Sequence, residues 1–400
     1  MHTLEIIFNE TIQDFEKNEF KAFSFEEAKK IYEYHNTIPQ YNETPLFSLH
    51  NLSKYYGVSN IFVKDESFRF GLNSFKVLGG SYAIGKILSN KLGITTLDFK
   101  EIRKNKEKLG NLTVTTATDG NHGRGVAWAC EQLGLRSIIF MPKGSKSERI
   151  DNIKKHGARV IVTDLNYDDT VRLARREADK NGWIIIQDTA WDNYMDVPLW
   201  IMQGYLTLAY ESYLALVQQK IEPTHIFIQA GVGAFAGATA AFFSQIYKND
   251  LKIVLIEPDE AACFYESIKN KKPTKVSGDL NTIMVGLACG EVNPIGWEIL
   301  KDTACAFIKC KDYVSANGMR ILSNPLHDDV RITSGESGAV PVGVVDYLLK
   351  RAALGKIREQ LNITDRSNML IVSTEGSTDC DNFKNIVWYG KYFDPLMQNL

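Results

Sequence analysis

The stretch Gly71-Leu72-Asn73-Ser74-Phe75-Lys76-Val77-Leu78-Gly79-Gly80-Ser81-Tyr82-Ala83 decides the fold of this chain. Lys76 stands between two apolar residues and ahead of a glycine pair, and a helix is predicted from Ser81 to Leu92. A lysine in apolar surroundings loses its charge more readily and becomes a nucleophilic amine, as Schiff-base chemistry requires. The plain alternative is a surface lysine that begins a helix. Two distant stretches favour the first interpretation.

The composition indicates a soluble globular protein with two domains. The 400 residues exceed what one compact core usually holds, and 44% are hydrophobic and 24% charged. A net charge of −2 without a long basic run makes nucleic acid or a membrane an unexpected partner. Because Met1 to Glu5 has no secretory pattern and no apolar run reaches ~18 residues, we expect a cytoplasmic location.

The cysteine and histidine patterns predict no metal site. The six cysteines form no C-x-x-C pair, and the seven histidines form no H-E-x-x-H motif. Reduced thiols are expected in the cytoplasm. Cys263 and Cys289 lie in loop-like contexts, and a disulfide between them is an open hypothesis.

Strands rich in Ile and Val alternate with helices along most of the chain, which is typical of parallel strands covered on both faces. Strands are predicted at 112–116, 136–141, 159–163, 183–187, 224–229, 252–257 and 369–373. Helices are predicted at 123–133, 147–156, 168–181, 197–219, 235–247 and 338–353. We therefore expect an α/β fold of two open parallel or mixed lobes: a small domain, 81–198, inserted into a large domain made of 1–80 and 199–400.

The second informative stretch is Ala230-Gly231-Val232-Gly233-Ala234-Phe235-Ala236-Gly237, at a strand-to-helix junction. Glycines bring backbone N–H groups close to a ligand, and a helix start adds positive dipole, so the stretch predicts a phosphate cradle. A dinucleotide fold offers a similar loop. Glu257, at the end of the next strand, would then contact the ribose, and this alternative stays open.

The third stretch is Thr116-Ala117-Thr118-Asp119-Gly120-Asn121-His122-Gly123-Arg124-Gly125, which follows a strand and opens a helix. Its N–H groups and the Thr118 hydroxyl would bind a carboxylate, and Asn121 would hydrogen-bond a phenolic oxygen. His122 is taken as a structural histidine.

Together the three motifs resemble the fold-type-II pyridoxal-phosphate enzymes, which include threonine and serine dehydratases and cysteine synthase. Their order and spacing match over most of the chain. Within that group the resemblance is to the diaminopropionate ammonia-lyases, through residues 73–82, 118–128, 187–191, 229–233 and 373–376. The chain departs from the threonine dehydratases at Asp119, where they carry a small neutral residue, and in having no long C-terminal extension.

The resemblance implies two lobes with pyridoxal 5′-phosphate in the cleft between them. Lys76 would hold the cofactor covalently, Phe75 would pack on its ring, and Asn121 would contact its ring oxygen. The phosphate would bind the residues at the helix start, Gly231, Val232, Gly233 and Ala234. Thr374 is preferred over its neighbour Ser373 as partner of the ring nitrogen, because related enzymes place a hydroxyl or thiol two residues before such a glycine.

Asp119 and Asp188 are the selective feature. Two carboxylates at the pocket edge would orient the second ammonium of 2,3-diaminopropionate, with Thr118 and Gly120 also binding substrate. Lys76 would take the α-proton of the L-isomer and Asp119 that of the D-isomer, giving pyruvate and two ammonia. The plain alternatives are a helix N-cap for Asp119 and a strand-end turn for Asp188.

Other functions stay open. The same fold would suit a serine or threonine dehydratase, a cysteine-synthase-like enzyme, or a non-catalytic protein that binds an amino acid or a nucleotide. A homodimer is the usual assembly of the group. The preferred isomer, the pathway and a bound monovalent cation, for which Glu257, Glu291 and carbonyls near Gly286 are candidate ligands, are left undecided.

Overall fold

The computed structural model of the chain describes residues 3–10, 12 and 20–395, which form two compact units. The larger unit comprises Met1–Phe25, Thr44–Phe68 and Leu208–Leu400, and the smaller unit comprises Glu26–Glu43 and Arg69–Thr207. The smaller unit thus includes Lys76. The domain boundaries predicted from the sequence, 81 and 198, stay a prediction.

A seven-stranded mixed sheet forms the centre of the larger unit, in the order β1-β10-β9-β8-β11-β3-β2. The strands are β1 (Leu4–Phe8), β2 (Leu46–Ser48), β3 (Asn60–Asp65), β8 (His225–Gln229), β9 (Lys252–Pro258), β10 (Ala304–Cys310) and β11 (Asn368–Ser373). The two edge strands, β1 and β2, are antiparallel to their neighbours, and the inner strands are parallel. Every residue of β8 is buried, as its continuous apolar sequence predicts for a central strand.

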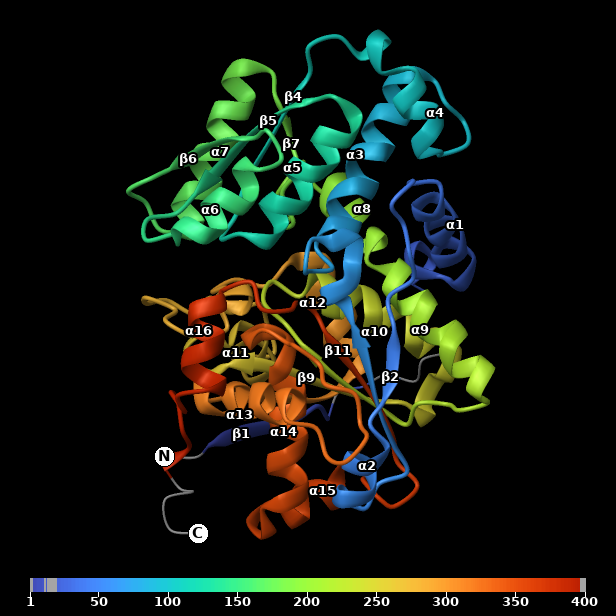
Figure 1. Cartoon of the computed structure of the whole chain (residues 1–400), viewed down its shortest axis with the longest axis vertical. Helices are drawn as coiled ribbons and strands as arrows, with labels where there is room; N and C mark the ends of the chain where they lie inside the picture. The colour runs from blue at the N-terminus through green and yellow to red at the C-terminus, as the bar shows by residue number, and fades with distance from the viewer. Residues whose placement is uncertain (1–2, 11, 13–19, 396–400) are drawn as a thin grey trace. The chain divides into compact units, whose positions relative to one another are not determined.

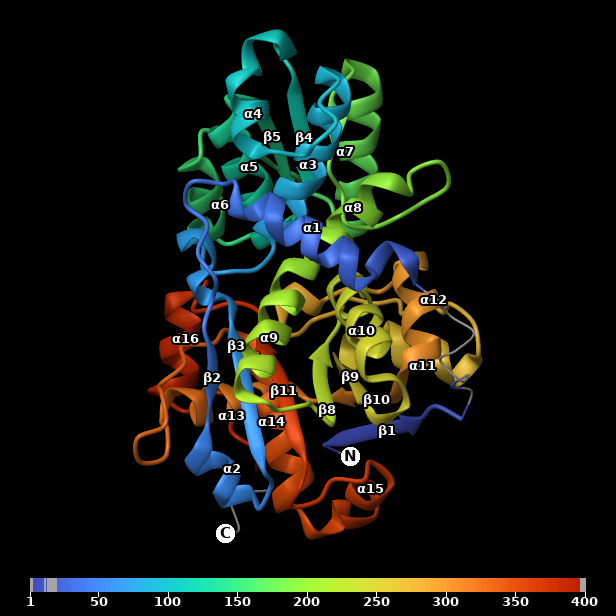
Figure 2. The same ribbon diagram turned by 90° about the vertical axis from the view of Figure 1, so that its right-hand side faces the viewer.

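Helices cover both faces of this sheet. They are α2 (His50–Tyr56), α9 (Leu206–Gln219), α10 (Ala234–Tyr247), α11 (Cys263–Asn270), α12 (Pro294–Thr303), α13 (Asp312–Ser323), α14 (Glu336–Lys350), α15 (Gly355–Gln360) and α16 (Cys380–Val387). Figures 1 and 2 show α13 and α14 on one face, and α9 and α10 on the other. The core beside α14 joins Val340 and Val344 to Phe227 and Ile371 of the sheet.

The smaller unit contains a parallel four-stranded sheet in the order β6-β5-β4-β7. Its strands are β4 (Thr113–Ala117), β5 (Arg136–Met141), β6 (Arg159–Val162) and β7 (Ile184–Ile185). Its helices are α1 (Phe25–Asn36), α3 (Val77–Leu92), α4 (Phe99–Lys104), α5 (Asn121–Leu133), α6 (Ser147–Lys154), α7 (Tyr167–Asn181) and α8 (Asp196–Gly204). The predicted α/β class with parallel and mixed sheets is confirmed in both units.

Alternating side chains of β5 contact different helices of the smaller unit. Ile138 and Phe140 pack in a cluster with Ala174 of α7, whereas Ile139 lies beside Gly123 of α5. Successive residues of a strand point to opposite faces, so α5 and α7 cover opposite sides of this sheet, as Figure 1 shows.

The structure corrects two predicted elements. The helix predicted over 197–219 is two helices, α8 and α9, that meet at Tyr205. At the end of α8, a Cβ on Gly204 would lie 2.5 Å from the Leu78 carbonyl oxygen, so glycine is required where α8 packs against α3. The strand predicted over 183–187 is shortened to two residues of β7, and the next residues are held by the Thr115 carbonyl and the Tyr194 hydroxyl. The sequence patterns did not predict strands β1 and β10 or helix α13.

Close packing around α3 explains the glycines that follow Lys76. A Cβ on Gly79 would stand 2.7 Å from side-chain atoms of Ile201 and Tyr205, and one on Gly125 of α5 would stand 2.7 Å from the Val77 Cα. Only hydrogen side chains let α5 and α8 approach the first turn of α3 this closely. Neighbouring helices therefore fix the position at which Lys76 begins α3.

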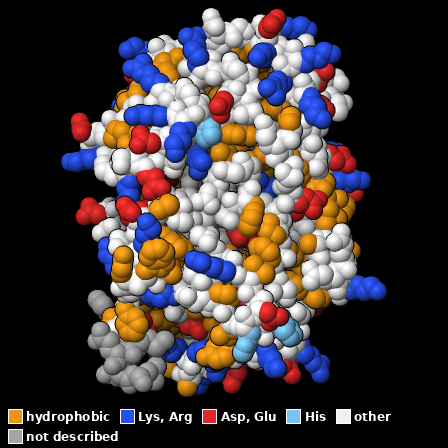
Figure 3. Space-filling view, viewed as in Figure 1, with side chains coloured by type: hydrophobic (Ala, Val, Ile, Leu, Met, Phe, Trp, Pro, Cys, Tyr) orange, Lys and Arg blue, Asp and Glu red, His pale blue; other side chains and the backbone are white. Residues whose placement is uncertain are grey.

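The surface mixes charges of both signs. On the face drawn in Figure 3, Lys and Arg side chains are interspersed with Asp and Glu side chains. Across residues 3–10, 12 and 20–395, no helix has both the length and the apolar character that a membrane crossing needs.

We expect Gly125→Ala to lower the free energy of unfolding by about 1–3 kcal/mol, because the added methyl group meets the rigid backbone of Val77. Urea denaturation would measure the change. Gly355→Ala is the matched control, because its Cβ would have only the Arg358 guanidinium within 4 Å, at 3.5 Å. An equal loss in both variants would show that the contact with α3 is not responsible.

Candidate active site

Lys76 is the N-cap residue of α3, and its side chain forms an ion pair within the smaller unit. The Ser74 hydroxyl oxygen accepts from the Lys76 backbone N–H at 3.4 Å, and the Lys76 Nζ lies 2.8 Å from Asp188 Oδ2. The side chains of Lys76 and Asp188 are 20% and 6% exposed, so the pair is largely shielded from water. The structure therefore brings together two of the three predicted catalytic residues.

The electrostatics of Lys76 differ from the prediction. Burial alone lowers the pKa of Lys76, but the charges of Asp188 and Asp119 and the hydrogen bond to Asp188 outweigh burial and raise it above its ordinary value. Burial likewise acts to raise the pKa of Asp188, and the Lys76 charge and its hydrogen bond overcome it and lower the value to about 2. The expectation of an easily neutralised lysine is therefore wrong for the paired state.

Asp119 lies in the loop between β4 and α5 and is 31% exposed. Its Oδ2 is 3.9 Å from Nη1 of Arg149, which also donates to the Asp119 carbonyl at 3.3 Å. Gly120 is the N-cap residue of α5, and the side chain that accepts from the first turn of that helix is Thr118, so the plain alternative of an N-cap role for Asp119 is wrong. Arg149 reaches this loop from α6, and no signal in the sequence identified it.

Thr118 shapes the same loop. Its hydroxyl oxygen accepts from the N–H groups of Gly120 and Gly123, both at 3.0 Å. A Cβ at Gly123 would stand 2.2 Å from the Thr118 methyl group, so glycine is required there. Asn121 is the first residue of α5 and is partly exposed. The binding roles predicted for Thr118, Gly120 and Asn121 stay predictions.

Phe75, a predicted site residue, and His122, predicted to be structural, also lie in the smaller unit. The Phe75 ring packs on Tyr205 with centroids 4.7 Å apart, and the Lys76 Nζ lies 5.7 Å from its centroid. His122 is buried, and its Nε2 is 2.8 Å from the Ile186 carbonyl oxygen, so Nε2 carries the proton. Burial lowers the pKa of His122, which favours the neutral ring.

The glycine-rich loop lies in the larger unit, between β8 and α10. Gly233 has φ +90°, and a Cβ there would stand 2.2 Å from Phe264, so two constraints require glycine. Within the described part of the chain, no acceptor faces the backbone N–H groups of Gly231, Val232 and Gly233. These donors precede the 14-residue helix α10, so the loop fits the phosphate of the predicted cofactor.

Thr374 follows β11 in the larger unit and is buried, as is Ser373. The Gln229 side-chain nitrogen donates to the Val372 carbonyl at 3.1 Å and to the Thr374 hydroxyl at 3.0 Å. Because the Thr374 hydroxyl oxygen accepts a hydrogen bond from Gln229, the hydrogen of this hydroxyl remains available to a ring nitrogen. The Ser373 hydroxyl instead pairs with Ser334 at 2.8 Å. This arrangement fits the predicted role of Thr374, and Gln229 is a supporting residue that the sequence analysis did not identify.

Glu257 and the cysteines lie near the glycine-rich loop. The Glu257 carboxylate accepts from the N–H groups of Phe264 and Tyr265 at 2.8 and 2.7 Å, and burial raises its pKa to about 8. Glu257 therefore caps α11, which argues against a ribose contact. Cys263 and Cys289 lie beside Gly231 and are not joined by a disulfide.

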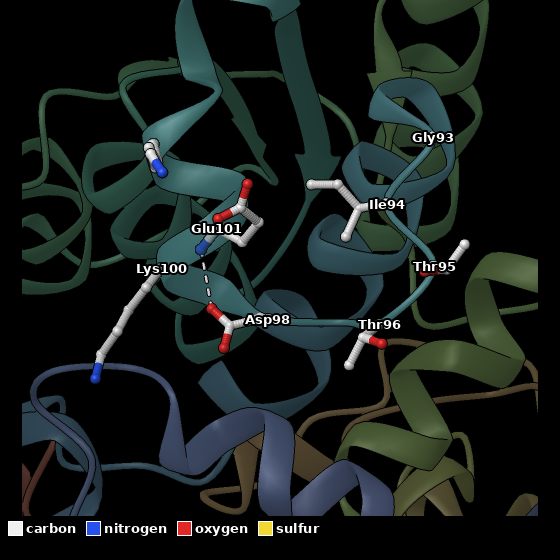
Figure 4. A pocket seen from close by; sticks show the side chains of 8 residues that line it. Gly93, Ile94, Thr95, Thr96, Asp98, Lys100 and Glu101 are labelled. Atoms are coloured by element: carbon white, nitrogen blue, oxygen red, sulfur yellow. Dashed lines mark hydrogen bonds between the residues drawn. The ribbon is translucent and has the colours of Figure 1, made fainter.

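Figure 4 shows a pocket elsewhere on the smaller unit, at the end of α3 and the start of α4. Asp98 accepts from the Glu101 N–H there and caps α4. The pocket is lined by Gly93, Ile94, Thr95, Thr96, Asp98, Lys100, Glu101 and Lys104. None of these is a predicted site residue.

Comparisons with known proteins identify the family of this chain. Residues 38–373 match the family model described as "Pyridoxal-phosphate dependent enzyme". The diaminopropionate ammonia-lyase of Escherichia coli strain K12 is 48% identical over 374 residues, which cover 92% of this chain and 93% of that protein. The enzyme of Salmonella typhimurium strain LT2 is 46% identical over 371 residues, covering 90% and 92%.

A solved structure is similar over nearly the whole chain. The crystal structure of the holo diaminopropionate ammonia-lyase from Escherichia coli matches with a TM-score of 0.92 and 45% identity, covering 98% of each chain. The chain belongs to the family of pyridoxal-phosphate dependent enzymes and, within it, to the group of the diaminopropionate ammonia-lyases.

Proposed function

We propose that this protein eliminates ammonia from 2,3-diaminopropionate, in the L and the D form, and yields pyruvate and a second ammonia. One observation carries the proposal: the Asp188 carboxylate lies 2.8 Å from the Lys76 Nζ, and the charge of Asp119, on a separate loop of the smaller unit, also raises the pKa of Lys76. The same two carboxylates suit a substrate with a second ammonium group, which serine and threonine lack. The relatives described above support the assignment.

Residues of this chain would bind each part of the cofactor. Lys76 would bind it covalently, Gly231 to Ala234 would bind its phosphate, and the free hydrogen of Thr374 would face its ring nitrogen. When bound, pyridoxal phosphate supplies an electron sink that allows the substrate to lose its α-proton. Phe75 and Asn121 would contact the cofactor ring and its oxygen.

The protein's own groups would move the protons. The Lys76 amine would take the α-proton of the L-isomer, and the Asp119 carboxylate that of the D-isomer, which presents its proton to the opposite face. Asp188, ionised because its pKa is about 2, would orient the β-ammonium group that leaves as ammonia. Arg149 holds the backbone of Asp119.

The cytoplasmic location and the homodimer stay proposals that rest on the sequence and on the usual assembly of this family. The alternative activities differ in substrate, so assays with a panel of amino acids distinguish them.

We expect the purified protein to absorb at ~410–420 nm with bound cofactor, and to form pyruvate from diaminopropionate with little product from serine, threonine or O-acetylserine. Borohydride reduction would fix the cofactor on Lys76, as peptide mass mapping would show. A protein that stays colourless in the presence of pyridoxal phosphate would contradict the proposal. Product from serine or threonine at comparable rates would favour a dehydratase.

Asp119→Asn tests whether Lys76 and Asp119 act as bases on different isomers. Loss of the base should lower kcat for the D-isomer by about 10²-fold or more, while L-isomer turnover changes by less than about fivefold. Separate assays of the two isomers measure the difference. Asp192→Asn, at an exposed position, is the matched control. Equal losses on both isomers would leave Asp119 without a role as base.

Asp188→Asn tests the charge of Lys76. The Asp188 charge raises the pKa of Lys76. The ion pair therefore stabilises the fold at neutral pH, and this stabilisation disappears as pH rises through the pKa of Lys76. Removing the carboxylate should move the midpoint of Lys76 labelling by an acylating reagent to lower pH in protein freed of cofactor, as mass spectrometry would measure. An unchanged midpoint would show that the ion pair does not control this lysine.

A further inference from the structure

Gln187 is fully buried directly before Asp188, and its amide orientation is fixed by its partners. Its side-chain oxygen accepts from the Ala117 N–H and from the Thr116 hydroxyl, both at 3.0 Å. A backbone N–H can only donate, so the atom that faces β4 must be the oxygen.

The amide nitrogen of Gln187 consequently faces the opposite direction. It donates to Asp188 Oδ1 at 3.3 Å and to the Tyr167 hydroxyl at 3.2 Å. The other carboxylate oxygen, Asp188 Oδ2, is the one that lies 2.8 Å from the Lys76 Nζ. The Asp188 carboxylate is thus held between a neutral donor and a cation, one on each oxygen.

The main chain of this segment is held by different groups. Ile186 N–H donates to the Thr115 carbonyl at 2.8 Å, and His122 donates to the Ile186 carbonyl. The Gln187 N–H donates to the Tyr194 hydroxyl at 2.8 Å, which donates to the Ile185 carbonyl at 2.9 Å. The backbone of Gln187 therefore stays fixed without its side chain, and the amide is left to act on Asp188.

We infer that Gln187 is a positioning residue: its amide sets the rotation of the Asp188 carboxylate and directs one oxygen at Lys76. The effect on turnover rests on the proposed lyase function, whereas the contact with Asp188 does not. The titratable groups that act on the Lys76–Asp188 pair are His122, Tyr205 and Asp119. Burial raises the pKa of Tyr194, which also lies beside the segment, so that this hydroxyl stays neutral.

Gln187→Glu isolates this contact. A glutamate keeps an oxygen for the Ala117 N–H and the Thr116 hydroxyl, but it replaces the N–H that faces Asp188. When protonated it still donates to Asp188, and when ionised it places a second carboxylate beside the first. Two buried carboxylates that share a proton titrate as a pair with one raised pKa.

The pH profile of kcat/KM gives the first measurement. We expect the variant to approach wild-type activity at the acidic end of the profile and to lose about tenfold or more as pH rises, through an ionisation that the wild type lacks. The melting temperature of the holoenzyme gives the second. A carboxyl group with a raised folded pKa stabilises at low pH, so the variant should lose stability relative to wild type as pH rises.

Two further variants separate positioning from folding. Gln187→Met keeps the length of the side chain but removes donor and acceptor, and it should lower kcat/KM at every pH without a new ionisation. Tyr194→Phe removes the backbone tether and leaves the amide in place, so it should lower the melting temperature with a wild-type pH profile.

A wild-type pH profile and a wild-type pH dependence of melting in Gln187→Glu would overturn the inference. The same displaced pH profile in Tyr194→Phe would also overturn the inference, because loosening the backbone at Gln187 would then be enough to change the ionisation. If wild-type protein forms no pyruvate from diaminopropionate, the proposed function fails, and the melting measurements still decide whether the Gln187 side chain controls Asp188.

Discussion

The ion pair between Lys76 and Asp188 is the interaction on which the smaller unit's site depends. Removing one partner of a largely buried pair would leave a charge without compensation, which is strongly unfavourable. The two residues come from opposite ends of the unit's sequence, one before α3 and one after β7. Their approach to 2.8 Å therefore requires that α3, α5 and the small sheet be packed correctly.

Helix packing supplies that precision. Glycines 79 and 125 bring α3 against α8 and α5 at distances that no other side chain permits, and a Cβ on Gly80 would lie 3.2 Å from a Val126 methyl group. The glycine pair after the lysine is therefore a packing requirement as well as part of a motif. His35 adds a polar contact, because its ring nitrogens reach the Thr207 hydroxyl at 2.6 Å and the Leu78 carbonyl at 3.1 Å. The start of α3 is consequently anchored on several sides.

Two glutamines perform similar tasks in the two units. Each has an amide whose orientation is fixed by a backbone group: Gln187 by the Ala117 N–H, and Gln229 by the Val372 carbonyl. Each then donates to a predicted site residue, Asp188 or Thr374. A buried amide is well suited to this work because its donor and acceptor ends cannot be exchanged without leaving a backbone group unpaired.

The sequence by itself determined the α/β class, most strands and helices and the glycine-rich loop, and it predicted Lys76, Asp119 and Asp188 as site residues. Those features depend on local patterns: runs of Ile and Val, glycine spacing and helix starts. Only the tertiary structure decided the break between α8 and α9, the raised pKa of Lys76, the pairing of Asp119 with Arg149 and the place of Gln187. These depend on contacts between residues far apart in the chain, and neither spacing nor composition specifies which side chains meet.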